Sequence, residues 1–237
     1  MDDSIIWRYM DFSKYVDLIS TREMFFCRSD LLGDPFEGSS TEKHHERRIE
    51  EIRRQANDFQ REVTMYVIAG MDYRKYVYVN CWHMSEYESA ALWRLYLKSD
   101  EGIAIQSTRN FLSSAVSGNK YGVWSVPVKY IDYFNDDPPM PTRMAAFRYK
   151  RKSFEHEKEL RAIVYADVND ETGNRLEPPA TNGVRVNTNL ERLITAIHLA
   201  PTAPDWLYDL TLRITRKFQI DAPVLRSSLT GDDSLFI

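Results

Sequence analysis

Glycine is scarce in this sequence. The chain has only 9 glycines among 237 residues, and no glycine-rich loop follows an apolar, strand-like segment. Such loops cradle nucleotide phosphates because glycine lets the backbone approach the phosphate closely. The sequence therefore predicts no glycine-cradled nucleotide site. It also lacks the Gly-x-Ser-x-Gly motif, so a hydrolase of that class is not supported.

The sequence also has few cysteines, no long apolar run and a small net charge. Cys27 and Cys81 are the 2 cysteines, and neither has a neighbour at metal-ligand spacing, so we expect reduced thiols and predict no metal site. No apolar run approaches membrane-spanning length, and the acidic start Met1-Asp2-Asp3 lacks the basic region of a signal peptide. The formal net charge of −4 gives no overall attraction to nucleic acid or an anionic membrane. These absences predict a soluble, cytoplasmic protein without membrane contact.

The composition that remains is typical of a globular protein, with 43% hydrophobic, 13% aromatic and 28% charged residues. Short strands and helices alternate without the regular rhythm of a doubly wound sheet. We therefore expect an α+β fold in a single domain, residues 1–237, with a central, mostly antiparallel sheet, continuous or split, flanked by helices. A densely charged helical insertion is expected at about 39–75. Expected strands cover residues 5–10, 23–28, 76–84, 102–106, 123–130, 157–165, 184–186, 196–199 and 222–225, and expected helices cover residues 12–20, 85–96, 190–194 and 204–218.

An acidic stretch, Glu157-Lys158-Glu159-Leu160-Arg161, carries the strongest functional signal. If residues 157–165 form a strand, Glu157, Glu159 and Arg161 lie on one side, roughly 6–7 Å apart. On a helix the three would splay around the axis. The β-branched and aromatic residues after Arg161 favour the strand.

Two carboxylates at this spacing could serve a site or could be structural. As like charges they raise one another's pKa, whereas Arg161 opposes that shift. The group suits stabilisation of an oxocarbenium-like centre, or general acid and base work at a glycosidic bond. In the structural alternative, Glu157 and Glu159 pair with the lysines and arginines just upstream.

Other candidate residues also have two interpretations. Arg8 is a charge within the apolar segment 5–10, so it needs a partner: Glu157 or Glu159 in a structural pair, or the phosphate or ribose of a ligand. Asp34 and Glu37 lie in a loop that we expect to be packed down, where they bind backbone amides or hold the loop over a pocket; the structural role is favoured.

The histidines carry less signal. We expect His83, which follows Trp82 on a strand, to satisfy a hydrogen bond in the core rather than act as a base.

Four motifs together resemble a bacterial family catalogued as domain of unknown function 2971. They follow one another in the family's order, and the resemblance extends from Trp7 to about Ser227. The motifs are Trp7-Arg8-Tyr9, Asp34-Pro35-Phe36-Glu37, Trp93 and Tyr96 ahead of Gly102-Ile103-Ala104-Ile105, and Glu157-x-Glu159-x-Arg161.

The family's layout is in turn similar to that of the ADP-ribosyltransferase superfamily. The resemblance implies that NAD is the co-substrate, with no metal, and that the nicotinamide glycosidic bond is cleaved by transfer or as an NAD glycohydrolase. It implies Glu159 and Glu157 as catalytic candidates, with Asp34 and Glu37 on a loop over the site. The implied cofactor-binding residues are Arg8, Tyr9, Trp93, Tyr96 and Arg161.

The resemblance also extends to phage-defence and toxin proteins, which implies a protein or nucleic-acid acceptor. A competing hypothesis is a non-catalytic regulatory or protein-interaction domain, such as a defence sensor or an antitoxin-like partner. In that case the same charged residues would form structural ion pairs.

Overall fold

The structure is a computed structural model that describes residues 3–55, 72–97, 99–140, 142–167, 170–174 and 176–230. Nine strands join in one sheet, and two more form a small separate sheet. The large sheet comprises β1 (Ile5–Asp11), β2 (Glu23–Arg28), β3 (Val77–Met84), β4 (Gly102–Thr108), β5 (Val123–Pro127), β8 (Glu159–Tyr165), β9 (Gly183–Asn187), β10 (Ala196–Leu199) and β11 (Val224–Arg226). The small sheet pairs β6 (Lys129–Ile131) with β7 (Tyr149–Arg151).

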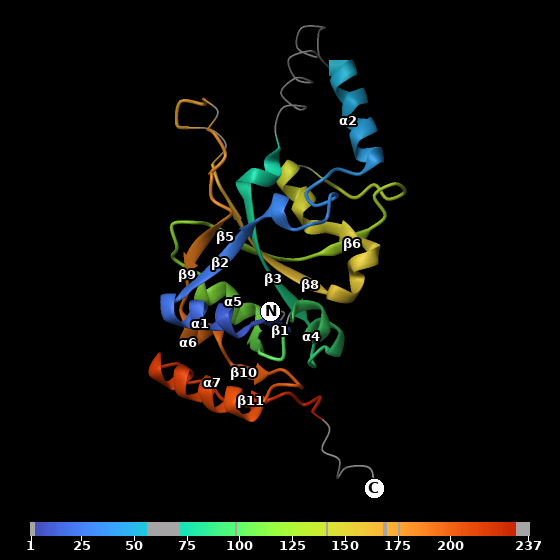
Figure 1. The fold of residues 1–237 in the computed structure, drawn as a ribbon. Helices are drawn as coiled ribbons and strands as arrows, with labels where there is room; N and C mark the ends of the chain where they lie inside the picture. Colours follow the sequence, from blue (N-terminus) through green and yellow to red (C-terminus); the bar gives the residue numbers. More distant parts are fainter. Residues whose placement is uncertain are drawn as a thin grey trace.

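Helices flank this sheet, as expected for an α+β fold (Figure 1). The α-helices are α1 (Phe12–Thr21), α2 (Glu42–Gln55), α4 (Ala90–Tyr96), α5 (Arg109–Ala115), α6 (Leu190–Leu193) and α7 (Asp205–Lys217). Short 3-10 helices are η1 (Ser29–Leu31), η2 (Tyr73–Tyr76), η3 (Arg143–Arg148) and η4 (Lys152–Glu157). No described helix is both long and apolar enough to cross a membrane.

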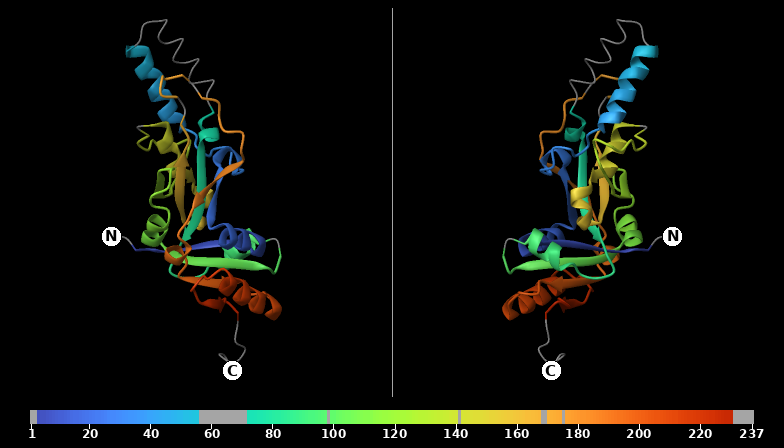
Figure 2. Two further views of the ribbon diagram at one scale, coloured as in Figure 1. Left: turned by 90° about the vertical axis from the view of Figure 1, so that its left-hand side faces the viewer. Right: turned by 90° about the vertical axis from the view of Figure 1, so that its right-hand side faces the viewer.

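The sheet divides at β3. Along one edge, β3 pairs with β8 over its whole length, from Val77 opposite Tyr165 to His83 opposite Glu159. The other edge is shared by β1 at one end and β2 at the other. The two halves therefore diverge, and Figure 2 shows β3 and β8 standing upright with β4 and β10 running across them. The predicted α+β fold with a mostly antiparallel sheet is confirmed.

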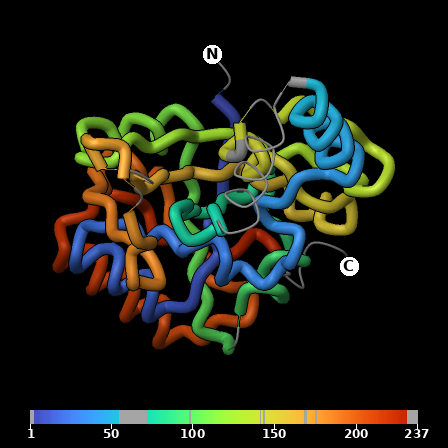
Figure 3. Tube along the Cα trace, turned by 90° about the horizontal axis from the view of Figure 1, so that it is seen from above, coloured from blue at the N-terminus to red at the C-terminus, as the bar shows by residue number. Residues whose placement is uncertain are grey.

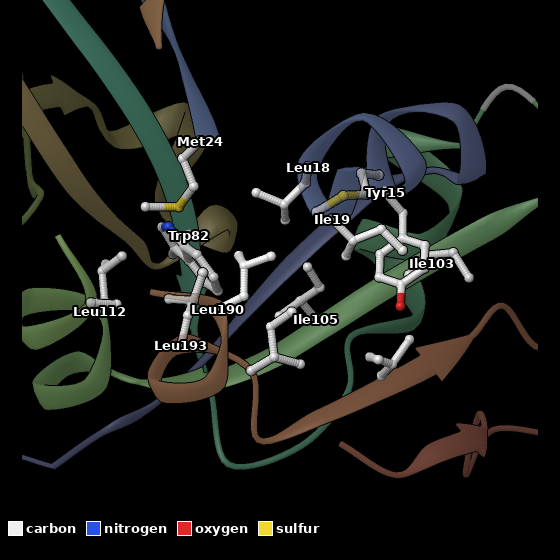
Figure 4. Packing of buried hydrophobic residues seen from close by; sticks show 14 of the residues in the cluster. Tyr15, Leu18, Ile19, Met24, Trp82, Ile103, Ile105, Leu112, Leu190 and Leu193 are labelled. Atoms are coloured by element: carbon white, nitrogen blue, oxygen red, sulfur yellow. The ribbon is translucent and has the colours of Figure 1, made fainter. Parts of the chain in front are cut away.

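One face of the sheet holds the main core. Helix α1 presents Tyr15, Leu18 and Ile19 to this core, at the spacing of one helical face. They gather with Ile103 and Ile105 of β4, as Figure 4 shows. Burying each such side chain contributes about 1.5–3 kcal/mol, so this cluster fixes α1 against the sheet.

The opposite face of β1 holds a smaller core. Because successive side chains of a strand point to opposite faces, Ile6 and Met10 join the main core while Trp7 and Tyr9 join the smaller one. Helix α4 covers the latter with Leu92 and Trp93. This packing places α4 against the aromatic side of β1.

Two predicted strands were wrong in part. Residues 123–130 form no single strand: β5 ends at Pro127, the Val128 amide still donates to the Glu159 carbonyl of β8, and β6 then pairs with β7 instead. The strand expected at 157–165 begins at Glu159. Lys158 has a left-handed backbone with φ 40°, so the chain turns between η4 and β8.

The charged segment forms helix α2, which projects from one end of the molecule. From above, α2 and α7 lie on opposite sides (Figure 3). The expected insertion at about 39–75 includes residues 56–71, which lie outside the described residues. The helix expected from residue 85 begins only at Ala90, where the Ser89 side chain caps it.

Candidate functional site

A small pocket opens on the aromatic side of β1. Strand β3 lies beside β1, and β8 lies on the other side of β3. The register places Trp7 opposite His83 and His83 opposite Glu159. Directly opposed residues share a face of the sheet, so these three side chains belong to the same side. The pocket is lined by Trp7, Tyr9, Cys81, Trp82, His83, Leu92, Tyr96, Glu157 and Glu159.

The cavity is narrow. Its volume is about 30 Å³, which is the share of liquid volume of about one water molecule. Tyr96, the last residue of α4, is 43% exposed, whereas Trp7 and Tyr9 are buried. The protein thus has an aromatic wall, and Tyr96 is the member of it that reaches solvent.

The two predicted glutamates meet in this pocket although they belong to different elements. Glu157 ends η4 and Glu159 opens β8, with the turn at Lys158 between them. Lys150 on β7 lies 2.5 Å from Glu157 Oε2 and 3.1 Å from Glu159 Oε2 through its Nζ. An upstream lysine therefore does pair with both acids, as the structural alternative predicted, and both acids also line the pocket.

Arg161 lies beneath the pocket in a closed ion network. Its Nε donates to Glu159 at 2.7 Å, and its Nη2 donates to Glu159 at 3.2 Å and to Glu37 at 3.0 Å. Its Nη1 donates to Glu37 and to the carbonyl of Phe147. The side chain is fully buried and all five guanidinium donors have partners. In this structure Arg161 has no donor left for a ligand.

The charges of this network control how Glu159 ionises. Burial alone would raise its pKa, but Arg161 and then Lys150 offset this and lower the pKa of Glu159 to about 2. Burial would likewise lower the pKa of Lys150, yet the two carboxylates raise it above its usual value. At neutral pH, Glu159 is therefore a carboxylate and Lys150 an ammonium group.

Arg8 lies on β1 between Trp7 and Tyr9 but is not among the residues that line the pocket. Its side chain is half-buried, and its Nη1 donates to the carbonyl of Cys81 at 3.4 Å. Burial lowers the pKa of Arg8, and electrostatic interactions with the Cys81 and Tyr96 side chains offset only part of this lowering. Among the described residues it makes no ion pair with Glu157 or Glu159. The predicted structural pair with the glutamates is thus not found.

The remaining predicted site residues divide into two groups. Tyr9 is in the pocket, where its hydroxyl accepts a hydrogen bond from the Ser89 amide and burial raises its pKa to about 12. Trp93 lies behind Tyr9, with ring centroids 4.8 Å apart, and does not line the cavity.

The loop residues Asp34 and Glu37 also lie away from the cavity. Asp34 accepts a hydrogen bond from the Phe36 amide and pairs with Arg151 at 2.9 Å, while Glu37 binds Arg161. These contacts fasten the loop to β7 and β8, and neither residue lines the pocket.

Sequence reasoning missed Lys150, Cys81 and His83 as pocket neighbours. His83 was expected to satisfy a core hydrogen bond, and its Nδ1 does lie 2.6 Å from the carbonyl of Glu157. It also lines the pocket, because β3 aligns it with Trp7 and Glu159. Only the strand register brings Trp7, His83 and Glu159 together, and no motif in the sequence encodes that register. Within the described parts of the chain, no group of three His, Cys, Asp or Glu residues could hold a metal ion.

Comparison with known proteins gives a distant structural likeness. No family model and no curated protein matches the chain, so the resemblance to domain of unknown function 2971 stays a prediction. Solved structures of Thermus sp. 2.9 DarT are similar in overall layout. The complex with NAD+ has 8% identity and a TM-score of 0.43 over 96% of both chains. The complex with ADP-ribosylated ssDNA has 9% identity and a TM-score of 0.42 over 95% of this chain and 94% of that one. At these values the likeness establishes no function for this chain.

Proposed function

We propose that this protein is an NAD-dependent, ADP-ribosyltransferase-like enzyme that cleaves the nicotinamide glycosidic bond. The observation that carries the proposal is that Glu157 and Glu159 line the same pocket as Trp7, Tyr9 and Tyr96. Aromatic faces attract a cationic ring such as a pyridinium, and carboxylates stabilise the positive charge that develops on the ribose. The pocket therefore suits an N-glycoside whose leaving group is already positively charged.

The ionisation of the site supports this choice over an ordinary O-glycoside. Glycosidases that cleave O-glycosides use a carboxylic acid with a raised pKa to protonate the leaving oxygen. Glu159 has the opposite property, with its pKa at about 2. Nicotinamide needs no proton to leave, because the electron pair of the broken C1′–N bond neutralises its ring nitrogen. The ribose C1′ then bonds to an oxygen or nitrogen of the acceptor, which releases a proton.

The roles follow from position. Glu157 or Glu159 stabilises the ribosyl cation, and Tyr96 and Tyr9 contact the nicotinamide ring. Arg8, whose Nη1 donates to the Cys81 carbonyl, binds a phosphate or ribose hydroxyl with its other guanidinium donors. Because the cavity holds about one water molecule, Tyr96 must swing outward to admit the ring. Trp93 and Arg161 support the site from behind. A protein or nucleic acid is the proposed acceptor, in a phage-defence or toxin context; with water as acceptor the product is ADP-ribose.

The direct test is incubation of the purified protein with NAD+ and measurement of released nicotinamide by chromatography. Glu157→Gln should reduce release by about 100-fold or more, since it removes a charge from the developing cation. Glu155→Gln is the matched control: it changes an exposed glutamate on the same short helix η4 and should leave the rate unchanged. A folded wild-type protein that neither binds NAD+ nor releases nicotinamide contradicts the proposal.

A non-catalytic regulatory domain is the second candidate. It is favoured by the closed Arg161 network and by the one-water volume of the pocket. Under this function, Glu157→Gln and Glu159→Gln would lower the free energy of unfolding by several kcal/mol with no activity to lose. Measuring stability and nicotinamide release on the same variants separates the two functions.

A further inference from the structure

Lys150 occupies an unusual place for a cation, between the two glutamates of the pocket. Its Nζ lies 2.5 Å from Glu157 and 3.1 Å from Glu159, and its side chain is only 12% exposed. The ammonium group also lies 4.8 Å from the centre of the Phe154 ring. These contacts hold it in one position from three sides.

The countercharges around the pair are unequally distributed. Arg161 is already shared between Glu159 and Glu37. Glu157 makes its ion pair with Lys150 alone among the described residues. Lys150 is thus the cation that offsets the second negative charge, and it comes from β7, in the small separate sheet.

We propose that Lys150 is a positioning residue that holds Glu157 and Glu159 side by side as carboxylates, so that the pocket keeps two negative charges at neutral pH. This inference rests on the proposed function for its catalytic consequence. Both carboxylates lie within hydrogen-bond distance of the same ammonium group, so its removal leaves Glu157 without its ion-pair partner, and repulsion between the two like charges then favours uptake of a proton by one of them. With the charge of Lys150 removed, one of the two carboxylates would be protonated, and the pocket would then carry one negative charge in place of two.

Of the other ionisable groups around the pair, Arg161 is a cation already shared between Glu159 and Glu37, which leaves Lys150 as the cation that Glu157 shares. These other groups are Arg8 on β1, Glu37 in the loop after η1, Cys81 and His83 on β3, Tyr96 on α4, Tyr130 on β6, Lys158 in the turn and Arg161 on β8. Burial raises the pKa of the Cys81 thiol and the Tyr96 and Tyr130 hydroxyls, and lowers the pKa of His83. These four groups are therefore neutral near pH 7.

The test compares Lys150→Met, which removes the charge at similar length, with Lys150→Arg, which keeps it. Lys150→Gln is a second charge-free variant in case the methionine variant does not fold. Lys152→Met is the matched control, because it removes an exposed lysine two residues away that pairs with Asp136 at the surface. Circular dichroism verifies the fold of each variant.

The first readout is nicotinamide release from NAD+ between pH 5 and 9. Lys150→Met should lose about tenfold or more at pH 7 and recover as the pH rises, because the captured proton is then released. Lys150→Arg should restore the wild-type pH profile, and Lys152→Met should match the wild type throughout. An active Lys150→Met variant with an unchanged pH profile overturns the inference and leaves the proposed function standing.

The second readout does not depend on activity. In protein carrying ¹³C-labelled glutamate, the side-chain carboxyl signals of Glu157 and Glu159 are assigned by their glutamine variants and followed with pH. We expect neither to titrate between pH 6 and 8 in the wild type, and one to do so in Lys150→Met. If neither signal moves in the variant, the inference fails. A wild-type protein without turnover refutes the proposed function, while these signals still decide the role of Lys150.

Discussion

At the scale of single residues, Arg161 explains how the acidic stretch can be structural and still contribute to the candidate site. A buried charge is tolerated only when its partners replace water, and Arg161 gains five such bonds from Glu159, Glu37 and the Phe147 carbonyl. The network fixes the Glu159 carboxylate in a single orientation at the edge of the pocket. The same contacts that stabilise the fold therefore orient the candidate catalytic group.

Glu37→Gln should destabilise the protein by about 3 kcal/mol, because it leaves the buried Arg161 with one carboxylate in place of two. The measurement is the free energy of unfolding from urea denaturation. Asp17→Asn serves as the control: Asp17 pairs with Arg185 at the surface, where the two side chains are 44% and 43% exposed. Such a pair contributes about 1 kcal/mol or less. Equal losses for both variants would contradict the structural importance of the network.

Acid should weaken the fold through Glu159. Its pKa is about 2 in the folded protein, below the value of about 4.3 for an unfolded chain, so its contribution to stability is complete above pH 4.3 and lost as the pH falls towards 2. Since one pKa unit corresponds to about 1.36 kcal/mol, the contribution is about 3 kcal/mol. Urea denaturation between pH 5 and 2 should show this loss in the wild type. The Glu159→Gln variant should have a flatter profile by that amount; an equally steep profile would assign the loss to other groups.

At the scale of elements, the sequence predicted best where one local rule decides. Strands β1 and β2 and helices α1 and α7 agree with their apolar periods to within a residue or two. The failures occur where tertiary contacts decide. Residues 123–130 are mostly apolar and suggested one long strand, yet the chain divides there and β6 pairs with β7, which the sequence did not predict. Neither η3 nor η4 has an apolar period that could have revealed it.

The candidate site could be predicted only in part for the same reason. Spacing predicted that Glu159 and Arg161 share a face, and they do. Spacing alone did not predict that Trp7, His83 and Glu159 form one row across three strands, because strand order and register are set by long-range pairing. Lys150 lies seven residues before Glu157, and only the turn of η4 brings the two side chains together.

Helix α4 contributes Leu92 and Tyr96 to the pocket lining, and the thiol of Cys81 can report on access to the pocket. Tyr96 at the end of α4 lines the pocket together with Cys81, and burial raises the pKa of that thiol. Alkylation of native protein by iodoacetamide should therefore be slow at Cys81. It should accelerate about tenfold or more in Tyr96→Ala, because a larger fraction of the thiol is ionised and the reagent reaches it more easily. Mass spectrometry of the Cys81 peptide gives the rate. Cys27 is an internal control; equal acceleration at both cysteines would indicate general loosening.

At the scale of the whole molecule, the divided sheet positions the pocket. Strand β3 carries β8 on one edge and both β1 and β2 on the other, and β1 leaves β3 after two paired positions. Beyond Trp7, β1 and β3 are no longer paired, and Tyr9 of β1, Cys81 of β3 and Leu92 of α4 line the pocket there. The pocket thus forms where the two halves of the sheet part, and a ligand bound there would contact both halves.

NAD+ should therefore stabilise the protein as a whole. A ligand at 100 times its dissociation constant adds about 2.7 kcal/mol to the free energy of unfolding, and for a domain of this size each kcal/mol raises the melting temperature by about 2–4 °C. Thermal unfolding with and without saturating NAD+ should show a rise of several degrees. Glu157→Gln should keep this rise, because the lost charge acts on the developing cation. Tyr96→Ala should reduce it, because a ring contact is removed. The Glu155→Gln control should behave as the wild type, and a rise that survives in Tyr96→Ala would place the nucleotide outside this pocket.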